Sequence, residues 1–217
     1  MLTKWKSVLA VLGLAALVAV PVVPAKPEAA RPGLPAFVAD PFGLENAGAG
    51  ATTPAAVVET PLEREQRALT EYIAKRYRIA EAAAHHFVLI SYRAGEQHRV
   101  DPVLILAVMA IESRYNPVAE SVVGAKGLMQ VLAKYHQEKL FDHGGEHALL
   151  DPEVNIHVGA QILREYQRRF ADTETALQMY AGALDEPTSR YATKVFDEKA
   201  RLDVIRWKAR KQTAQSA

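Results

Sequence analysis

A carboxylate closes the most apolar stretch of this sequence. Nine consecutive apolar residues, 103–111, lead directly to Glu112. Burying a carboxylate costs on the order of several kcal/mol unless it is paired or protonated. Glu112 is therefore either one half of a structural ion pair or an acid whose surroundings raise its pKa. In the second case it can donate a proton to a leaving group near neutral pH.

The residues around this stretch predict a helix that carries Glu112 near its end. Asp101-Pro102 supplies an N-cap and a proline at the first helical position. Asn116-Pro117 should stop the helix, because the residue before a proline avoids helical geometry, so we expect it to run to residue 114 or 115. Glu112 then lies in the last turn, where the helix dipole disfavours a negative charge.

A glycine-bearing segment follows the helix. Residues 121–127 contain two glycines three apart, Gly124 and Gly127, which predict a tight turn with room for a small β-excursion. The next residues, up to Gln130, should return the chain toward the face that carries Glu112.

Four blocks of residues give this arrangement a family resemblance. They are Glu112-Ser113-x-x-Asn116-Pro117, Gly124-Ala125-x-Gly127-Leu128-Met129-Gln130, Asp151-Pro152-x-x-Asn155-Ile156-x-x-Gly159, and Ala176-Leu177-Gln178-Met179-Tyr180 with Tyr191. Their order and spacing resemble the lytic transglycosylases of the soluble-lytic-transglycosylase (goose-lysozyme-like) catalytic domain family. The resemblance covers residues 101–195, under half of the chain.

The resemblance implies an all-α, lysozyme-like fold with a groove for peptidoglycan strands. It also implies a carbon–oxygen lyase that cleaves between N-acetylmuramic acid and N-acetylglucosamine and leaves 1,6-anhydro-muramic ends. Glu112 would be the single catalytic acid and base, and no cofactor or metal is implied. Other acids are conjectural second carboxylates, and we favour surface roles for each of them: Glu120, Asp142, Asp151 and Asp185.

Six further positions carry over as substrate-binding residues. Ser113 and Gln130 would hydrogen-bond substrate or orient the site, and Met129 would line the groove floor. Gly127, with Gly124, would let the backbone approach the saccharide. The remaining two, Tyr180 and Tyr191, would flank the Glu112 carboxyl group or stack on sugar, although core packing explains both tyrosines equally well. Asn116 fits a turn better than a sugar contact.

The sequence departs from the family pattern at three places. Ala181 stands where the family usually has Asn after the first tyrosine, which removes a polar group near the acid. Residues 131–136 replace a Met-Pro segment, and 185–187 replace a Gly-rich loop.

Away from these motifs the chain divides by composition. Residues 1–25 read as an export signal with a basic start, an apolar stretch and a small-residue cleavage pattern; the alternative is an uncleaved membrane anchor through residues 8–23. Residues 26–61 are rich in Pro, Ala and Gly and predict a disordered linker. Residues 62–212 predict the helical domain, and 213–217 a tail. Either fate of residues 1–25 places the domain outside the cytoplasm, and we expect the periplasm.

Apolar periodicity predicts the remaining helices. Beyond the buried helix, we expect helices from residue 62, over 79–93 with Gly95 ending the helix, over 131–140, from 152 to about 170 behind an Asp151 cap, over 174–180 behind Asp172 or Thr173, and over 189–211. The adjacent His85 and His86 lie about 100° apart on a helix, which suits exposed surface better than a shared metal.

Composition excludes several classes of function. Lys and Arg exceed Asp and Glu by 26 − 25 = 1, so the sequence lacks the strong basic excess of a nucleic-acid binder. The absence of cysteine excludes disulfides, a cysteine nucleophile and a lipid-modified cysteine. Residues 190–211 are nonetheless basic, which fits a solvated helix face or, alternatively, contact with an anionic polymer or membrane surface.

Two other functions remain open on the sequence. One is a weakly active or inactive module that binds peptidoglycan, which Ala181 favours and the intact Glu112 disfavours. The other is hydrolysis, as in a lysozyme. Protein partners are unknown from the sequence.

Overall fold

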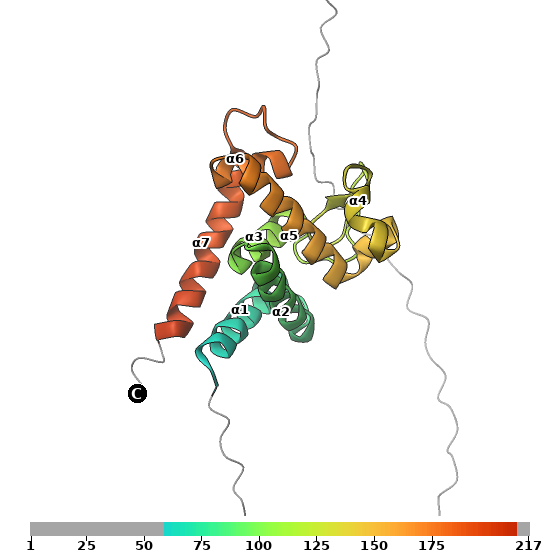
Figure 1. Cartoon of the computed structure of the whole chain (residues 1–217). Coiled ribbons are helices and arrows are strands. Elements are labelled where there is room, and N and C mark those ends of the chain that lie inside the picture. Colours follow the sequence, from blue (N-terminus) through green and yellow to red (C-terminus); the bar gives the residue numbers. More distant parts are fainter. Residues whose placement is uncertain (1–58, 212–217) are drawn as a thin grey trace, which may run out of the picture. The chain divides into compact units, whose positions relative to one another are not determined.

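The fold is built around helix α3 (Pro102–Glu112) in the computed structural model, which describes residues 59–211. Every residue from Val103 to Ala110 is at most 4% exposed, as the run of apolar residues predicts. Figure 1 shows α3 near the middle of the domain, with α7 along one edge and α5 on the other side. The predicted signal and nearly all of the predicted linker lie outside the described residues.

The architecture is the expected mostly helical domain with a minimal sheet. Its elements are α1 (Pro61–Tyr77), α2 (Glu81–His98), α3, α4 (Gln137–Leu140), α5 (Pro152–Arg169), α6 (Thr173–Tyr180), α7 (Arg190–Lys211), β1 (Ala125–Lys126) and β2 (Val131–Leu132). Short 3₁₀ turns occupy Ala133–Tyr135, Phe141–His143 and Glu146–Leu150. Among the described residues no helix is long and apolar enough to cross a membrane.

Aspartate N-caps fix the starts of three helices. Side chains of Asp101, Asp151 and Asp172 accept backbone hydrogen bonds in the first turns of α3, α5 and α6. Such a cap contributes about 1 kcal/mol. These helix starts therefore follow from local sequence, as predicted. Helix α1 begins one residue before the predicted domain start, because Thr60 and Glu63 form a capping box ahead of Pro61.

The predicted end of α2 is wrong. Gly95 lies inside the helix, and Arg99, in the left-handed region at φ 58°, terminates it instead. A Cβ on Gly95 would lie 2.7 Å from the carbonyl oxygen of Val100 and 3.2 Å from Pro102. The glycine is therefore needed for close packing between the end of α2 and the start of α3, rather than for a helix stop.

Helix α3 is also shorter than predicted. It ends at Glu112, because Arg114 and Tyr115 both adopt left-handed backbone conformations, at φ 53° and 64°. Tyr115 is 1% exposed, and its hydroxyl donates to the carbonyl of Leu106 over 2.9 Å. The chain therefore changes direction before Asn116, and the buried Tyr115 holds this change of direction in place.

The predicted helix over 131–140 is mostly absent. The small β-excursion takes its first residues, since Val131 pairs with Lys126 and Leu132 with Ala125 in an antiparallel ladder. His136, at φ −139°, then separates the following 3₁₀ turn from the four residues of α4. The pairing is tertiary information that helical composition alone does not carry.

Salt bridges attach the C-terminal helix α7 to α1 and to the start of α3. Arg210 pairs with the buried Glu65, and Arg76 lies 3.3 Å from the buried Glu198. Lys199 contacts Asp101 over 2.8 Å. These contacts hold the middle and the end of α7 against α1 and against the start of α3.

Candidate active site

Glu112 is the last residue of α3 and remains only partly exposed. Burial raises its pKa to about 7, although a hydrogen bond from Tyr191 acts in the opposite direction. Among residues 59–211 no charged partner acts on Glu112, so the structural ion-pair alternative has no support there. The carboxyl group can therefore exist in both protonation states near neutral pH.

Tyr191 reaches Glu112 from the first turn of α7. Its hydroxyl donates to Oε1 of Glu112 over 2.6 Å. Burial and the charge of Glu112 raise the pKa of Tyr191 well above its usual value, so the phenol stays protonated as a donor. Of the two predicted roles for this tyrosine, the contact with the carboxyl group is the one found in the structure.

Gln178, to which the sequence analysis gave no role, fixes the start of α7. This side chain is 3% exposed. Its Oε1 accepts the backbone N–H of Ala192 and its Nε2 donates to the carbonyl of Ala183, both over 3.0 Å. Gln178 therefore bridges the α6–α7 connection next to Tyr191. The signal available in the sequence was a glutamine between the apolar residues Leu177 and Met179.

Tyr180 lies near the same carboxyl group but bonds elsewhere. Its hydroxyl donates to the backbone carbonyl of Met129 over 2.8 Å. Burial, followed by the charge of Glu112, raises its pKa well above the usual value. Tyr180 is thus bonded to the Gly127–Gln130 turn and lies near enough to Glu112 to feel its charge.

Met129 and Gly127, in that turn, have surroundings other than those we predicted. Met129 is fully buried against Gly159, so its side chain offers no surface as a groove floor. Gly127, at φ 74°, is buried, and a Cβ there would lie 2.3 Å from both Asn155 Nδ2 and the carbonyl of Leu149. The glycine makes room for Asn155 rather than for a saccharide.

Asn155 organises the turn from α5. Its Oδ1 accepts the N–H of Met129 over 2.7 Å, and its Nδ2 donates to the carbonyls of Lys126 and Leu149 over 2.9 and 2.8 Å. The residue is 1% exposed. Asn155 belongs to one of the four sequence motifs without a predicted role; in the structure it holds the turn in place.

Ser113 and Gln130 keep part of their polar capacity for a ligand. The hydroxyl of Ser113 donates to the carbonyl of Met109 over 3.3 Å, so its lone pairs remain available. Nε2 of Gln130 donates to the carbonyls of Ala119 and Gly127, so the amide oxygen is the group left for a ligand. Asn116 accepts the N–H of Val118, which is the predicted turn role.

A cleft of about 520 Å³ borders the site. Gln130 and Tyr180 line it, together with Tyr135, Tyr166 and the exposed Ala181. Glu112 itself is not part of its lining. Tyr180, which lies near enough to Glu112 to feel its charge, thus also lines the cleft, and Tyr135 and Tyr166 add two more aromatic rings.

The conjectured second carboxylates have other surroundings. Glu120 pairs with Lys126, and Asp151 caps α5. Asp142 is exposed, and Asp185 lies exposed at the cleft rim. Among residues 59–211 no group of three His, Asp or Glu side chains is arranged to hold a metal ion, and His85 and His86 are both exposed, as predicted.

The site therefore consists of a half-buried acid at a helix end and a nearby cleft lined by tyrosines, within a mostly helical domain. Residues 89–200 match the family described as Transglycosylase SLT domain, just over half of the chain. The chain therefore belongs to this family.

Curated relatives agree with the family match. The chain is 34% identical over 111 residues to a transglycosylase of Enterobacteria phage PRD1, covering 51% of this chain and 40% of that protein. It is 35% identical over 113 residues to membrane-bound lytic murein transglycosylase C of Sodalis glossinidius, covering 49% of this chain and 29% of that protein. The match thus spans well under half the length of these relatives.

Among solved structures, the chain is similar to the 70 kDa soluble lytic transglycosylase of Escherichia coli. The sequences are 19% identical, the TM-score is 0.42, and the match covers 71% of this chain and 29% of that one.

Proposed function

We propose that this protein is a lytic transglycosylase that binds peptidoglycan strands and cleaves the bond from N-acetylmuramic acid to N-acetylglucosamine. The observation that carries the proposal is the Glu112 carboxyl group, with its pKa near 7 and its hydrogen bond from Tyr191. An acid titrating near the working pH can act first as a proton donor and then as a proton acceptor.

In the first step, protonated Glu112 donates its proton to the glycosidic oxygen. The bond from C1 to that oxygen breaks, and the electron pair leaves with the oxygen. The substrate's own acetamido oxygen relieves the positive charge that develops at C1, as in glycosidases that use one carboxylate. Tyr191 then stabilises the new Glu112 carboxylate through its hydrogen bond.

In the second step, the Glu112 carboxylate removes the proton from the C6 hydroxyl of the muramic acid. The C6 oxygen bonds to C1 and displaces the acetamido oxygen, which closes the 1,6-anhydro ring. Glu112 is protonated again and water is not consumed. The aromatic cleft next to Tyr180 is a suitable binding surface for the neighbouring sugars.

Product analysis of purified sacculi tests the reaction. Anhydro-ended muropeptides are expected; reducing ends would instead indicate hydrolysis, and release of no product would indicate a binding module. Glu112→Gln should lower turnover by roughly 10²–10⁴-fold while retaining binding, the usual contribution of a general acid. If Glu112→Gln cleaves as fast as the parent, Glu112 is not the acid.

Asp185→Asn tests whether Asp185 serves as a second catalytic carboxylate. Asp185 is the conjectured second acid that borders the cleft, so a two-carboxylate mechanism would lose most of its turnover in this variant. The one-carboxylate mechanism predicts a change of less than about threefold, the scale expected when an exposed charge is removed.

Ala181 supports the binding module as the second candidate. It presents a methyl group at the cleft where the family pattern has Asn. The module would bind sacculi with unchanged affinity after Glu112→Gln and release no muropeptides in either form, which the product analysis detects.

We also propose that the domain works in the periplasm, on the basis of the export-like residues 1–25. Fractionation of cells that produce the full chain tests this. Protease accessibility from the periplasmic side supports the proposal, and protection by the inner membrane contradicts it.

A further inference from the structure

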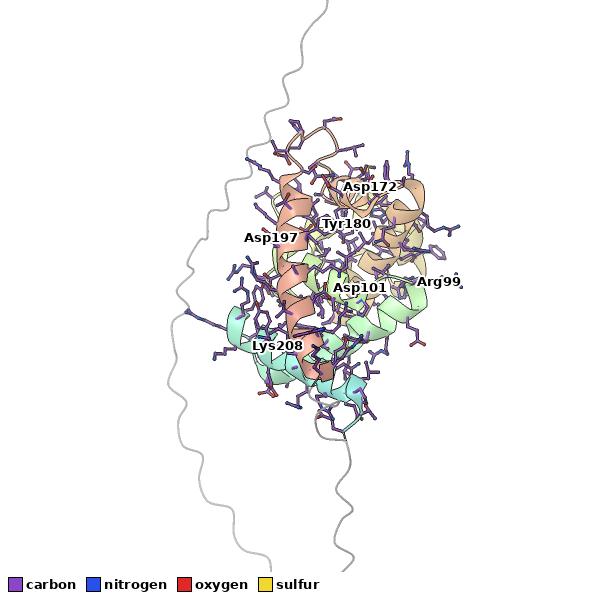
Figure 2. All side chains as sticks on the ribbon, turned by 90° about the vertical axis from the view of Figure 1, so that its left-hand side faces the viewer. Arg99, Asp101, Asp172, Tyr180, Asp197 and Lys208 are labelled. Atoms are coloured by element: carbon purple, nitrogen blue, oxygen red, sulfur yellow. The ribbon has the colours of Figure 1, made fainter. Side chains whose placement is uncertain are left out.

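A second hollow, separate from the aromatic cleft, lies between the end of α2 and one flank of α5. It has a volume of about 610 Å³. Three arginines line it: Arg99 follows α2, while Arg164 and Arg168 lie on α5. Gln97, His98, Gln161 and Glu165 complete the lining. Arg99 lies at the edge of the domain away from α7 (Figure 2).

The three arginines of this hollow form no ion pair within the part of the chain that the structure describes. Within residues 59–211 no carboxylate lies within 4.0 Å of Arg99, Arg164 or Arg168, whereas Arg67, Arg93 and others each have such a partner. The acid in the lining, Glu165, is engaged 2.9 Å away by Lys139. Three guanidinium groups thus line one hollow with a single carboxylate, which is paired with a lysine, so their mutual repulsion is only partly offset.

The position of the arginines on α5 is only partly explained by the helix itself. Arg168 lies in the last turn, where a cation is favoured by the helix dipole. Arg164 lies a full turn earlier and is half-buried, where that effect has faded. The helix dipole therefore does not explain why an arginine occupies position 164.

His98 adds an unfulfilled polar group. It lines the same hollow, and its Nε2 is buried without a hydrogen-bond partner. Its ring lies edge-on to His157, with 5.7 Å between the centroids. A buried nitrogen without a partner costs free energy, and in the tautomer that carries the proton on Nε2 an acceptor that reached this nitrogen would remove that cost.

We propose that this hollow binds an oxyanion, a phosphate or a carboxylate group. The guanidinium group offers several N–H donors in a planar fork that matches the oxygens of both anions. In peptidoglycan the carboxylates belong to the stem peptides, whereas a phosphate comes from another source. The hollow and the aromatic cleft occupy different flanks of α5, since Ile162 and Tyr166 line only the cleft.

Titration of the full chain with inorganic phosphate tests the site, with chloride holding the ionic strength constant. Saturable shifts in the side-chain NMR signals of His98 and the arginines are expected. The double variant Arg164→Gln/Arg168→Gln should bind at least about tenfold more weakly, since hydrogen bonds to charged groups contribute strongly. A parallel titration uses a stem tripeptide with free carboxylates and the same peptide fully amidated.

The matched control is Arg169→Gln/Arg78→Gln, which removes the same charge outside the hollow. Arg169 lies over the ring of Phe170. The site is supported if phosphate saturates it, or if the free but not the amidated peptide does, and if only the Arg164/Arg168 variant loses this binding. The probe that saturates identifies the source of the anion. No saturation by either probe, or equal losses in both double variants, overturns the proposal. Neither result depends on glycan cleavage.

Discussion

The hydroxyl of Tyr191 donates a hydrogen bond to Oε1 of Glu112 across 79 positions of sequence. Two opposing effects determine the pKa of Glu112. Burial favours the neutral carboxyl group, while the tyrosine donor favours the carboxylate, and the pKa settles near 7. A group that must release and recover a proton within one reaction benefits from that balance.

Tyr191→Phe should remove the hydrogen bond and leave the ring. Because this bond lowers the pKa of Glu112, its loss should raise that pKa above about 7. Glu112 is needed in its protonated form first, so the alkaline fall in activity should move to higher pH. The maximum rate should fall by about tenfold, since the new carboxylate loses a charge-assisted donor. A pH–rate profile on sacculi measures both effects.

Tyr180→Phe is the control for that profile. It removes a hydroxyl that donates to the carbonyl of Met129 rather than to Glu112. The alkaline limb should therefore stay in place even if the rate falls. An identical shift in both variants would show that the limb does not report the Tyr191–Glu112 bond.

Glu112→Gln should stabilise the folded protein above neutral pH. The pKa of Glu112 is near 7 in the folded state and its usual value is 4.5, so the folded state binds the proton more tightly than the unfolded state does. The free energy of unfolding of the parent must therefore fall as pH rises from about 4.5 to 7. By pH 8 the loss should be roughly 1–3 kcal/mol.

Urea denaturation at pH 4.5 and pH 8 measures this difference. The variant should lack that part of the pH dependence contributed by Glu112, and should exceed the parent in stability only at the higher pH. If both proteins show the same dependence on pH, the Glu112 carboxyl group is not held neutral by the fold.

Local signals predicted the helix starts and the presence of the acid, but not the contacts around it. Asp101, Asp151 and Asp172 act within one turn of themselves, so their caps are readable from the sequence. The hydrogen bond to Glu112 depends instead on where α7 packs. Motif spacing therefore predicted the same roles for Tyr180 and Tyr191. Only the fold shows that Tyr191 bonds to Glu112 and Tyr180 to the carbonyl of Met129.

Glycines were harder to interpret from the sequence, for the same reason. Gly95 was expected to end a helix and Gly127 to approach a ligand, yet both make room for other parts of the chain. Because glycine lacks a Cβ, it is equally suited to a turn, to a helix end and to a close contact between two parts of the chain. Only the neighbours, such as Asn155 beside Gly127, distinguish these uses.

Gly127→Ala should destabilise the fold far more than Gly124→Ala. Both glycines have positive φ, 74° and 85°, so an alanine is strained at either position. At Gly127 the added Cβ would also lie 2.3 Å from Asn155 and Leu149, whereas at Gly124 nothing lies within 4 Å. We expect a cost of about 1 kcal/mol at Gly124 and an additional 1–3 kcal/mol or so at Gly127.

Thermal or urea unfolding of the two variants compares these costs directly. Asn155 accepts a hydrogen bond from the N–H of Met129, and the carbonyl of Met129 accepts one from the Tyr180 hydroxyl. Because displacing Asn155 would disturb both bonds, Gly127→Ala should also reduce activity. Equal destabilisation in the two variants would mean that backbone strain, rather than the contact with Asn155, limits this position.

Ala181→Asn should increase activity by several-fold. Ala181 is exposed at the cleft, in ordinary helical geometry, and its N–H is bonded to the carbonyl of Leu177. An asparagine fits this backbone and restores the polar group of the family pattern next to Tyr180. Because the site is exposed, the free energy of unfolding should change by less than about 0.5 kcal/mol.

The rate of anhydro-muropeptide release, measured as kcat/KM on sacculi, checks this expectation. Ala171→Asn provides the control, since Ala171 is exposed between α5 and α6 and does not line the cleft. It should leave the rate unchanged. A rate for Ala181→Asn equal to that of the parent would show that the alanine does not limit turnover, and would direct attention to residues 131–136, where the cleft is bordered by strand β2 and the turn after it.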